Sequence, residues 1–184
     1  RLVSVADEHA PVELRALAQG FNTMARAIDD AQQSMQIRID EATARLAHQA
    51  LHDALTGLPN RRAFEQALEE AVHASRRAQD HGVLCFIDLD RFKIVNDSCG
   101  HAAGDELLRG IAHLLRQRVR SEDLICRIGG DEFALLLRGC DIHEGERIAN
   151  GLREAIASYR FNWDDRRFTV GASIGLVSID GSLE

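Results

Sequence analysis

The chain has 184 residues with a formal net charge of −7, and 45% of its residues are hydrophobic. That length accommodates one ordinary domain plus an appendage, and the apolar content is enough to form a hydrophobic core. We expect neither a transmembrane span nor a signal peptide. An acidic balance excludes a general binder of nucleic-acid polymers, which needs a basic footprint. The four scattered cysteines contain no Cys-x-x-Cys pair, so they are predicted to be small buried residues in a reducing compartment.

Residues 1–52 contain one glycine and one aromatic residue, which predicts a long helix, and a compact domain is predicted from Asp53 onward. An apolar seam with alternating steps of three and four runs through Leu14, Leu17, Phe21, Met24, Ile28, Ala31 and Met35. The next step, from Met35 to Ile39, is again four, so two steps of four fall in succession, a stutter that locally unwinds a supercoil. The narrow seam favours pairing with a second helix, and packing against its own domain is the alternative.

The compact part alternates helix and strand. Asn60 is predicted to cap a helix, which precedes a buried strand over 83–87 that ends in Asp-Leu-Asp. One helix follows, and then two strands flank Gly-Gly-Asp-Glu as a β-hairpin. A further helix and a last strand over 168–179 complete the domain. This order predicts an α+β fold of the ferredoxin-like kind, in which helices cover a mostly antiparallel sheet.

Three carboxylates, those of Asp88, Asp131 and Glu132, stand at the ends of apolar strands. Anionic groups at the rim of a dry sheet repel one another, and a divalent cation with a preference for hard oxygen ligands, Mg²⁺ or Mn²⁺, removes that cost. Magnesium commonly bridges one or two carboxylates to substrate phosphates, so the pattern indicates a phosphate-bearing substrate. The alternative is that Asp131 and Glu132 are polar turn residues.

Two further features point to phosphate. Gly129 and Gly130 lack Cβ atoms, which permits positive φ and close approach of a ligand, although a turn can require glycine for its own sake. Lys93, the only lysine of the sequence, lies five residues after Asp88, where an ammonium can meet a phosphate. An accidental surface lysine is the alternative.

In this order the motifs resemble the GGDEF-domain diguanylate cyclases. The stretches that carry the resemblance are Asp-Ala-Leu-Thr-Gly-Leu-Pro-Asn-Arg-Arg at 53–62, Phe-Ile-Asp-Leu-Asp-Arg-Phe-Lys-Ile-Val-Asn-Asp at 86–97, Gly-His-Ala-Ala-Gly-Asp-Glu-Leu-Leu at 100–108, Arg-Ile-Gly-Gly-Asp-Glu-Phe at 127–133 and Ser-Ile-Gly at 173–175. The resemblance implies a nucleotidyl-cyclase-type sheet. It also implies the condensation of two GTP molecules into cyclic di-GMP, with release of two pyrophosphates, across a domain dimer.

The resemblance also implies roles for residues. Asp88 and Asp131 would hold the metal with the backbone carbonyl of Leu89, and Glu132 would lie near the ribose hydroxyl or a metal-bound water. Lys93 resembles a phosphate contact of the family.

The backbone near Phe92 resembles a second phosphate contact, and Gly129 and Gly130 would also contact the substrate. Asn96 and Asp105 resemble guanine readers, because their oxygens can accept from guanine N1–H and N2–H₂. Helix capping is the alternative for both.

Residues 120–123, Arg-Ser-Glu-Asp, resemble the inhibitory Arg-x-x-Asp site of the family. There Arg120 and Asp123 would receive the phosphates and guanine edges of bound product. Gly151 stands where family members often place a second arginine, so we expect product binding with reduced affinity. A solvated charge pair is the alternative.

Residues 1–34 resemble part of a HAMP module, its second helix, and 35–52 a coiled-coil signalling linker. The resemblance implies a homodimer through the N-terminal helix. It further implies a parent protein on the cytoplasmic side of the inner membrane, with this portion soluble. Residues 53–184 are expected to lack the C-terminal helix of the family, which supplies further phosphate contacts. The alternative function is therefore a catalytically impaired module that binds GTP or cyclic di-GMP.

Overall fold

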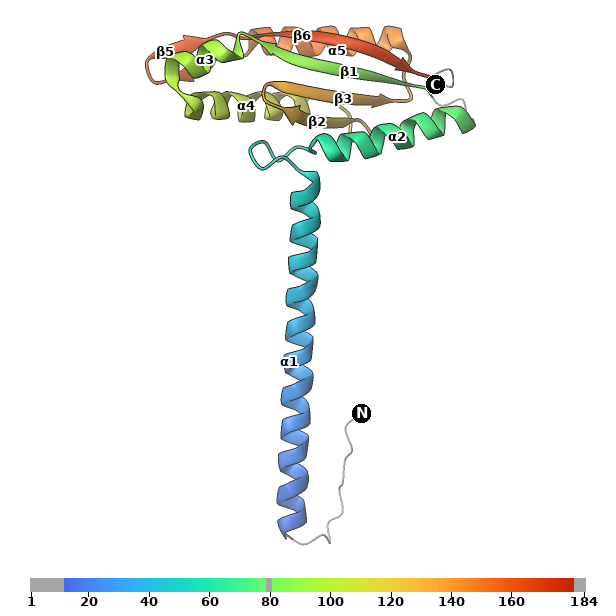
Figure 1. Cartoon of the computed structure of the whole chain (residues 1–184), viewed down its shortest axis with the longest axis vertical. Coiled ribbons are helices and arrows are strands. Elements are labelled where there is room, and N and C mark those ends of the chain that lie inside the picture. Colours follow the sequence, from blue (N-terminus) through green and yellow to red (C-terminus); the bar gives the residue numbers. More distant parts are fainter. Residues whose placement is uncertain (1–11, 79–80, 181–184) are drawn as a thin grey trace. The chain divides into compact units, whose positions relative to one another are not determined.

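The computed structural model describes residues 12–78 and 81–180. The chain divides into two compact units, residues 1–48 and 49–184. Helix α1 (Val12–Leu51) is uninterrupted over 40 residues, which confirms the long helix expected from the scarcity of glycine (Figure 1). Of the expected HAMP segment, residues 1–11 lie outside the described part, as do residues 181–184 of the expected domain.

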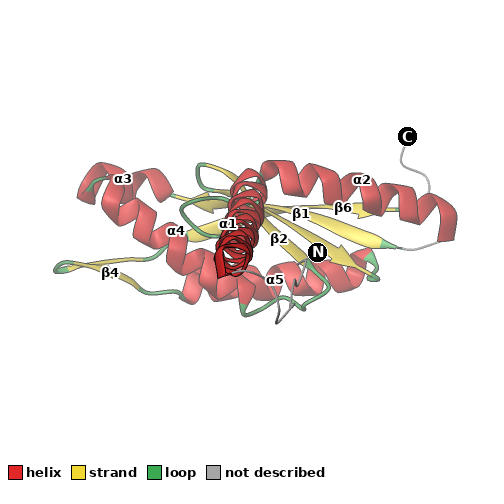
Figure 2. Ribbon diagram, turned by 90° about the horizontal axis from the view of Figure 1, so that it is seen from below, coloured by secondary structure: helices red, strands yellow, loops and turns green. Residues whose placement is uncertain are grey.

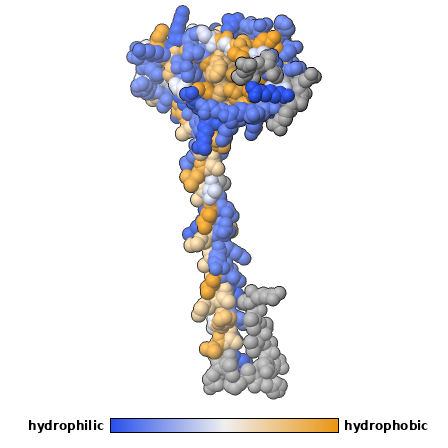
Figure 3. Space-filling view, turned by 45° about the vertical axis from the view of Figure 1, so that its right-hand side comes forward, coloured by the Kyte–Doolittle hydropathy of each residue, from blue (hydrophilic) through white to orange (hydrophobic). Residues whose placement is uncertain are grey.

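The apolar seam of α1 is exposed. Leu17, Phe21, Met24 and Met35 have 73%, 64%, 61% and 65% of their surface accessible, and Figure 3 shows apolar side chains along this helix. An apolar stripe of this length is a surface suited to pairing with another helix. No helix in the described ranges is long and apolar enough to cross a membrane.

The second unit is built on a four-stranded antiparallel sheet. Strands β1 (Gly82–Asp90), β2 (Leu124–Gly129), β3 (Glu132–Arg138) and β6 (Gly171–Ile179) lie in the order β2-β3-β1-β6. β1, which is almost entirely apolar until its last residues, occupies a central place in the sheet, and most of its residues are buried. The predicted antiparallel α+β sheet is confirmed.

Helices cover both faces of the sheet (Figures 1 and 2). Alternate residues of β1 pack with α4 (His101–Arg116) and α5 (Ile142–Ser158) in the larger core, whereas Leu84 belongs to a smaller core with Phe64 of α2 (Arg61–Ala78). Asn60 caps α2 as predicted, because its Oδ1 accepts the Ala63 N–H at 3.1 Å. The sheet therefore lies between two layers of helices.

Two elements differ from the sequence-based expectation. The single helix predicted after β1 is divided into α3 (Phe92–Cys99) and α4, because Gly100 between them has a φ of 83°. The predicted strand over 168–179 begins only at Gly171, and a separate hairpin of β4 (Phe161–Trp163) and β5 (Arg166–Phe168) precedes it.

The cysteines largely behave as predicted. Cys85, Cys126 and Cys140 are buried, and Cys99 is partly buried. Burial raises the pKa of both Cys85 and Cys126 to about 12, so these thiols remain neutral at physiological pH.

Close packing of α5 on β1 generates the first prediction. A Cβ at Gly145 would lie 2.8 Å from Cγ1 of the fully buried Val83, whereas a Cβ at Gly151 of the same helix meets nothing within 4 Å. Gly145→Ala should lower the free energy of unfolding by about 1–3 kcal/mol through overpacking. Gly151→Ala should leave it unchanged or raise it. Urea denaturation measures both, and equal behaviour of the two variants would contradict the packing shown.

Candidate active site

The turn between β2 and β3 carries the Gly-Gly-Asp-Glu motif. Gly129 and Glu132 are the last paired residues, so Gly130 and Asp131 form a two-residue loop. Gly130 has a φ of 51°, a left-handed value that glycine adopts without steric cost. The predicted hairpin is confirmed, and its sharp turn places two carboxylates at the end of β3.

Asp88 and Glu132 are direct cross-strand partners, and strand alternation directs both side chains to the α2 side of the sheet. Asp131 precedes Glu132 in the turn, where its carbonyl accepts the Leu89 N–H at 3.3 Å. Because the N–H and C=O of one strand residue point the same way, the Leu89 carbonyl also faces the turn. Over the described ranges, no hydrogen bond or ion pair engages the side chains of Asp88, Asp131 or Glu132.

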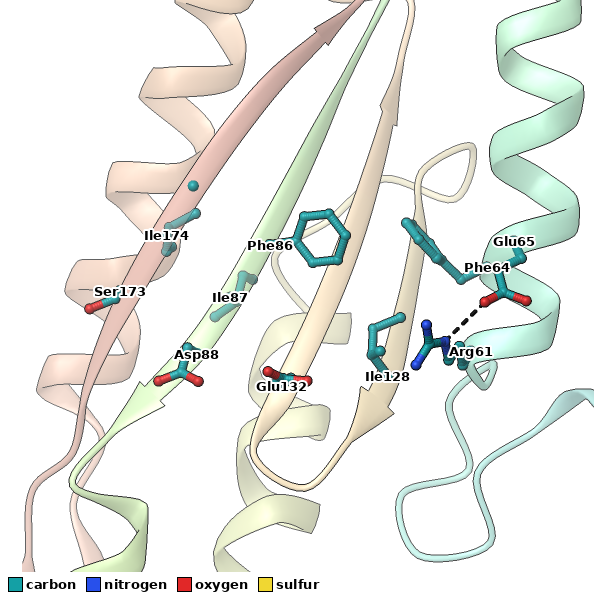
Figure 4. Close-up of a pocket in the computed structure, with 11 residues that line it drawn as sticks. Arg61, Phe64, Glu65, Phe86, Ile87, Asp88, Ile128, Glu132, Ser173 and Ile174 are labelled. Atoms are coloured by element: carbon teal, nitrogen blue, oxygen red, sulfur yellow. Dashed lines mark hydrogen bonds and ion pairs between the residues drawn. The ribbon is translucent and has the colours of Figure 1, made fainter.

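A pocket of about 610 Å³ opens on the same side of the sheet (Figure 4). Asp88 and Glu132 lie at one end of it, near the tip of β1, with Ser173 on β6 close by. Phe86 and Ile128 line its apolar part; Ile128 is the extra residue of a bulge in β2. The pocket therefore combines an anionic end with an apolar wall.

Helix α3 begins directly after the strand that carries Asp88. Arg91, between β1 and α3, has a φ of 65°, a left-handed value that is uncommon for a residue with a side chain and that clusters at ligand sites. Phe92 and Lys93 form the first turn of α3, where main-chain N–H groups lack partners within the helix and favour anions. Lys93 is exposed.

Asn96 and Asp105 lie within helices rather than at their starts. The residues at the N-cap positions are Arg91 for α3 and Gly100 for α4, so the capping alternative is wrong. A Cβ at Gly104 would overlap Oδ1 of Asn96, so the Asn96 side chain rests on the backbone next to Asp105. The Asn96 side chain therefore lies against the residue that precedes Asp105 in α4.

Arg120 and Asp123 belong to one loop between α4 and β2. The Asp123 carboxylate accepts the main-chain N–H of Arg120 and that of Arg138, each at 3.2 Å. The Arg120 guanidinium donates to Glu144 of α5 at 3.2 Å. Gly151 lines a different depression, beside the C-terminal end of α4. The expected product-site pair is therefore held together, with its guanidinium already engaged.

Arg127, two residues before the Gly-Gly-Asp-Glu motif, ties the turn to the loop of residues 53–60. Its Nε and Nη2 donate to the Gly130 carbonyl at 3.1 and 2.8 Å, and its Nη1 donates to both carboxylate oxygens of Asp53 at 3.0 Å. Its main-chain N–H donates to the Pro59 carbonyl at 2.9 Å. The Arg127 side chain is 12% exposed, so these charged hydrogen bonds form with little competition from water.

Asp53 is also the organiser of its own loop. Its Oδ1 accepts the main-chain N–H of Thr56 at 2.9 Å and the Thr56 hydroxyl at 2.7 Å. Burial by itself raises the pKa of Asp53, but the hydrogen bonds from Thr56 and Arg127 together outweigh it and hold the pKa below the ordinary value of 3.8. The charged form is thus the one that the fold requires.

Comparison with known proteins identifies the domain. The family model "Diguanylate cyclase, GGDEF domain" matches residues 50–183. The chain belongs to this family. The probable diguanylate cyclase DgcE of Escherichia coli K12 is 47% identical over 135 residues, 73% of this chain and 12% of DgcE. The diguanylate cyclase TpbB of Pseudomonas aeruginosa PAO1 is 47% identical over 125 residues, 68% of this chain and 28% of TpbB. This chain therefore spans less than a third of either relative.

The fold agrees with a solved relative. The crystal structure of the diguanylate cyclase SiaD in complex with its activator SiaC, from P. aeruginosa, superposes with a TM-score of 0.71 at 29% identity, covering 94% of this chain and 73% of that one. The predicted GGDEF family and the predicted cyclase-like fold are confirmed. The HAMP portion remains a prediction.

The carboxylates of this GGDEF domain fit a divalent cation. Asp88 and Glu132 offer hard oxygen atoms on one face of adjacent strands, and within the described residues no protein cation neutralises them. No group of three or more His, Cys, Asp or Glu in that part of the chain is arranged to hold a metal.

Four residues of the GGDEF site were not predicted. Arg61 and Ser173 line the pocket. Arg127 and Asp53 form the ion pair that ties the turn to the loop of residues 53–60, which we call the clamp. All four belong to motifs that were recognised. However, Asp53 and Arg127 are 74 positions apart, and nothing local in the sequence indicates that they meet.

The clamp predicts a pH dependence of stability. Since the pKa of Asp53 is lower in the folded domain, its contribution to stability is present above pH 3.8 and is lost as the pH falls below that value. Asp53→Asn should lower stability at neutral pH and flatten the loss on acidification. Thr56→Val, which keeps the carboxylate but removes one donor, should be intermediate. Urea denaturation at a series of pH values measures this; an unchanged acid slope in Asp53→Asn would contradict it.

Proposed function

We propose that this domain condenses two GTP molecules into cyclic di-GMP. Each 3′-oxygen forms a bond to the α-phosphorus of the GTP held by a facing copy, and the bond to the β-phosphate breaks to release pyrophosphate. In-line displacement at phosphorus depends on positioning and charge neutralisation. The observation that carries the proposal is the set of carboxylates at the adjacent ends of β1 and β3, which no protein cation among the described residues neutralises.

Asp88 and Asp131, with the carbonyl of Leu89, are the proposed ligands of Mg²⁺ or Mn²⁺. The bound metal would polarise the α-phosphate and lower the pKa of the attacking hydroxyl. Glu132, the cross-strand partner of Asp88, would accept a hydrogen bond from the ribose hydroxyl or a water molecule.

The nucleotide would extend from these carboxylates along α3. Lys93 and the main-chain N–H groups near Phe92 would receive the β- and γ-phosphates at the helix start. Asn96, whose side chain lies against Gly104, and the neighbouring Asp105 would accept from the guanine edge, which adenine cannot match.

The reaction needs two copies of the domain. The exposed seam of α1 supports a homodimer formed through this helix, in which pairing would set the alignment of the two catalytic halves. The proposed parent protein is tethered at the cytoplasmic side of a membrane by an upstream segment and relays signals through a HAMP module into this helix.

Product inhibition is proposed at Arg120 and Asp123. Both side chains lie in one loop, and Asp123 fixes the backbone of Arg120 through a hydrogen bond of 3.2 Å. A guanidinium and a carboxylate held together can receive a phosphate and a guanine edge at the same time.

A catalytically impaired module that binds GTP or cyclic di-GMP is the second candidate. Phe86 and Val177 are 46% and 48% exposed on the α2 side of the sheet, so the described elements cover this face only in part. Incomplete cover of this face would let nucleotide bind without turnover.

The acidic end of the pocket generates an activity prediction. Asp88→Asn should reduce cyclic di-GMP formation from GTP and Mg²⁺ by about a hundredfold or more, because it removes a charged ligand of the metal that would neutralise the reacting phosphate. Glu65→Gln removes one negative charge from the same pocket and should retain activity within a few-fold. Chromatography of the products measures turnover. Binding of a fluorescent GTP analogue without any product in the unaltered protein would favour the second candidate.

The packing of Asn96 generates a prediction on affinity. Gly104→Ala should displace the Asn96 side chain and weaken GTP binding about tenfold or more, since two guanine contacts depend on its position. Gly151→Ala is the matched control, because its new Cβ meets nothing. Titration with the fluorescent GTP analogue provides the comparison, and equal affinities for the two variants would argue against guanine reading by Asn96.

A further inference from the structure

Two arginines from different elements share one carboxylate oxygen. Oε1 of Glu144 lies 3.2 Å from Nη2 of Arg120, in the α4–β2 loop, and 3.3 Å from Nη2 of Arg147, one turn further along α5. The Glu144 side chain is 32% exposed, and the two arginines are 56% and 75% exposed. The cluster is therefore open to a ligand from solution.

The position of Glu144 is fixed by the start of α5. Asp141 is the N-cap residue, and its Oδ1 accepts the Glu144 N–H at 2.8 Å. Glu144 thus occupies the place of the second member in a capping box, which commonly returns its side chain to the N-cap N–H. Here its Oε1 accepts from the two guanidiniums instead.

Two guanidiniums that converge on one point repel each other unless an anion lies between them. The carboxylate of Glu144 fills that position in the structure. A phosphodiester oxygen would fit there equally well, because guanidinium groups bind phosphate and carboxylate with the same fork of donors. The anion position lies next to the Arg120 loop, which is ordered by Asp123.

We propose that Arg147 is the second arginine of the product-binding site and that Glu144 competes with product for both guanidiniums. This inference rests on the product site proposed above at Arg120 and Asp123. Binding would exchange the Glu144 carboxylate for a phosphate of cyclic di-GMP, which leaves the charge around Arg120 and Arg147 balanced. Glu144 thereby sets how much product must accumulate before inhibition begins.

Arg147 fits this role better than the position at which a second arginine was expected. Gly151 has no side chain and lines another depression. Arg147 precedes it by one helical turn, on the same face of α5, and its guanidinium already meets the anion that Arg120 holds. The product site is therefore complete without an arginine at 151, and the affinity lost there is recovered at Arg147.

Isothermal titration of the full chain with cyclic di-GMP tests the inference. Since partly exposed ion pairs are weak, Glu144→Gln should tighten binding by about three- to tenfold, and Arg147→Ala should weaken it by a similar factor. The substitution keeps the main-chain N–H of residue 144, which Asp141 caps. Glu146→Gln, on the same helix and paired with His143 at 3.9 Å, is the matched control and should leave affinity within about twofold. In the Arg147→Ala background the gain from Glu144→Gln should shrink.

Arg120→Ala distinguishes a failure of the proposed product site from a failure of the inference about Arg147 and Glu144. If it leaves the affinity for cyclic di-GMP unchanged, or if the unaltered chain binds none, the product site at Arg120 and Asp123 is wrong and the inference falls with it. If Arg120→Ala abolishes binding while Glu144→Gln fails to tighten it and Arg147→Ala fails to weaken it, the product site stands and the inference is overturned. Thermal unfolding of each variant confirms that the fold is retained.

Discussion

The guanidinium of Arg127 holds the Gly-Gly-Asp-Glu turn between β2 and β3 in place. It donates to the Gly130 carbonyl inside the turn and to both oxygens of Asp53 outside it, in surroundings that largely exclude water. A planar fork with five donors can serve both partners at once, which a lysine could not. Without it the turn carbonyl and the Asp53 carboxylate would lose their partner in a partly buried place, and the carboxylates at the end of β3 would lose their fixed position.

The protein balances the charges of the two proposed ligand sites in different ways. At the end of the sheet, Asp88 and Glu132 face each other without a protein cation in the described part of the chain, which is the arrangement that a metal and a triphosphate would complete. In the α4–β2 loop, Arg120 is satisfied by Glu144, so a ligand there must displace an internal partner. Under the proposals above, the first site would attract its ligand strongly, whereas the second would bind product only when product is abundant.

Much of the fold was predictable because it follows from local pattern. The apolar run of β1, the cap at Asn60 and the turn chemistry of Gly130 are properties of short segments, and each was found as expected. The division of α3 from α4 was missed because a single glycine with positive φ decides it. The β4–β5 hairpin was missed because strands of three residues carry too little alternation to be distinguished from loop.

The sequence by itself determined the family, the antiparallel sheet and the candidate residues, because motif order and periodicity are written along the chain. Only the tertiary structure decided which of those residues meet. The pairing of Asp53 with Arg127 across 74 positions, and of Arg120 with Glu144 across 24, depends on how helices and strands pack. Ionic contacts of this kind have no local signature, because any carboxylate and any guanidinium can pair once the fold brings them within reach.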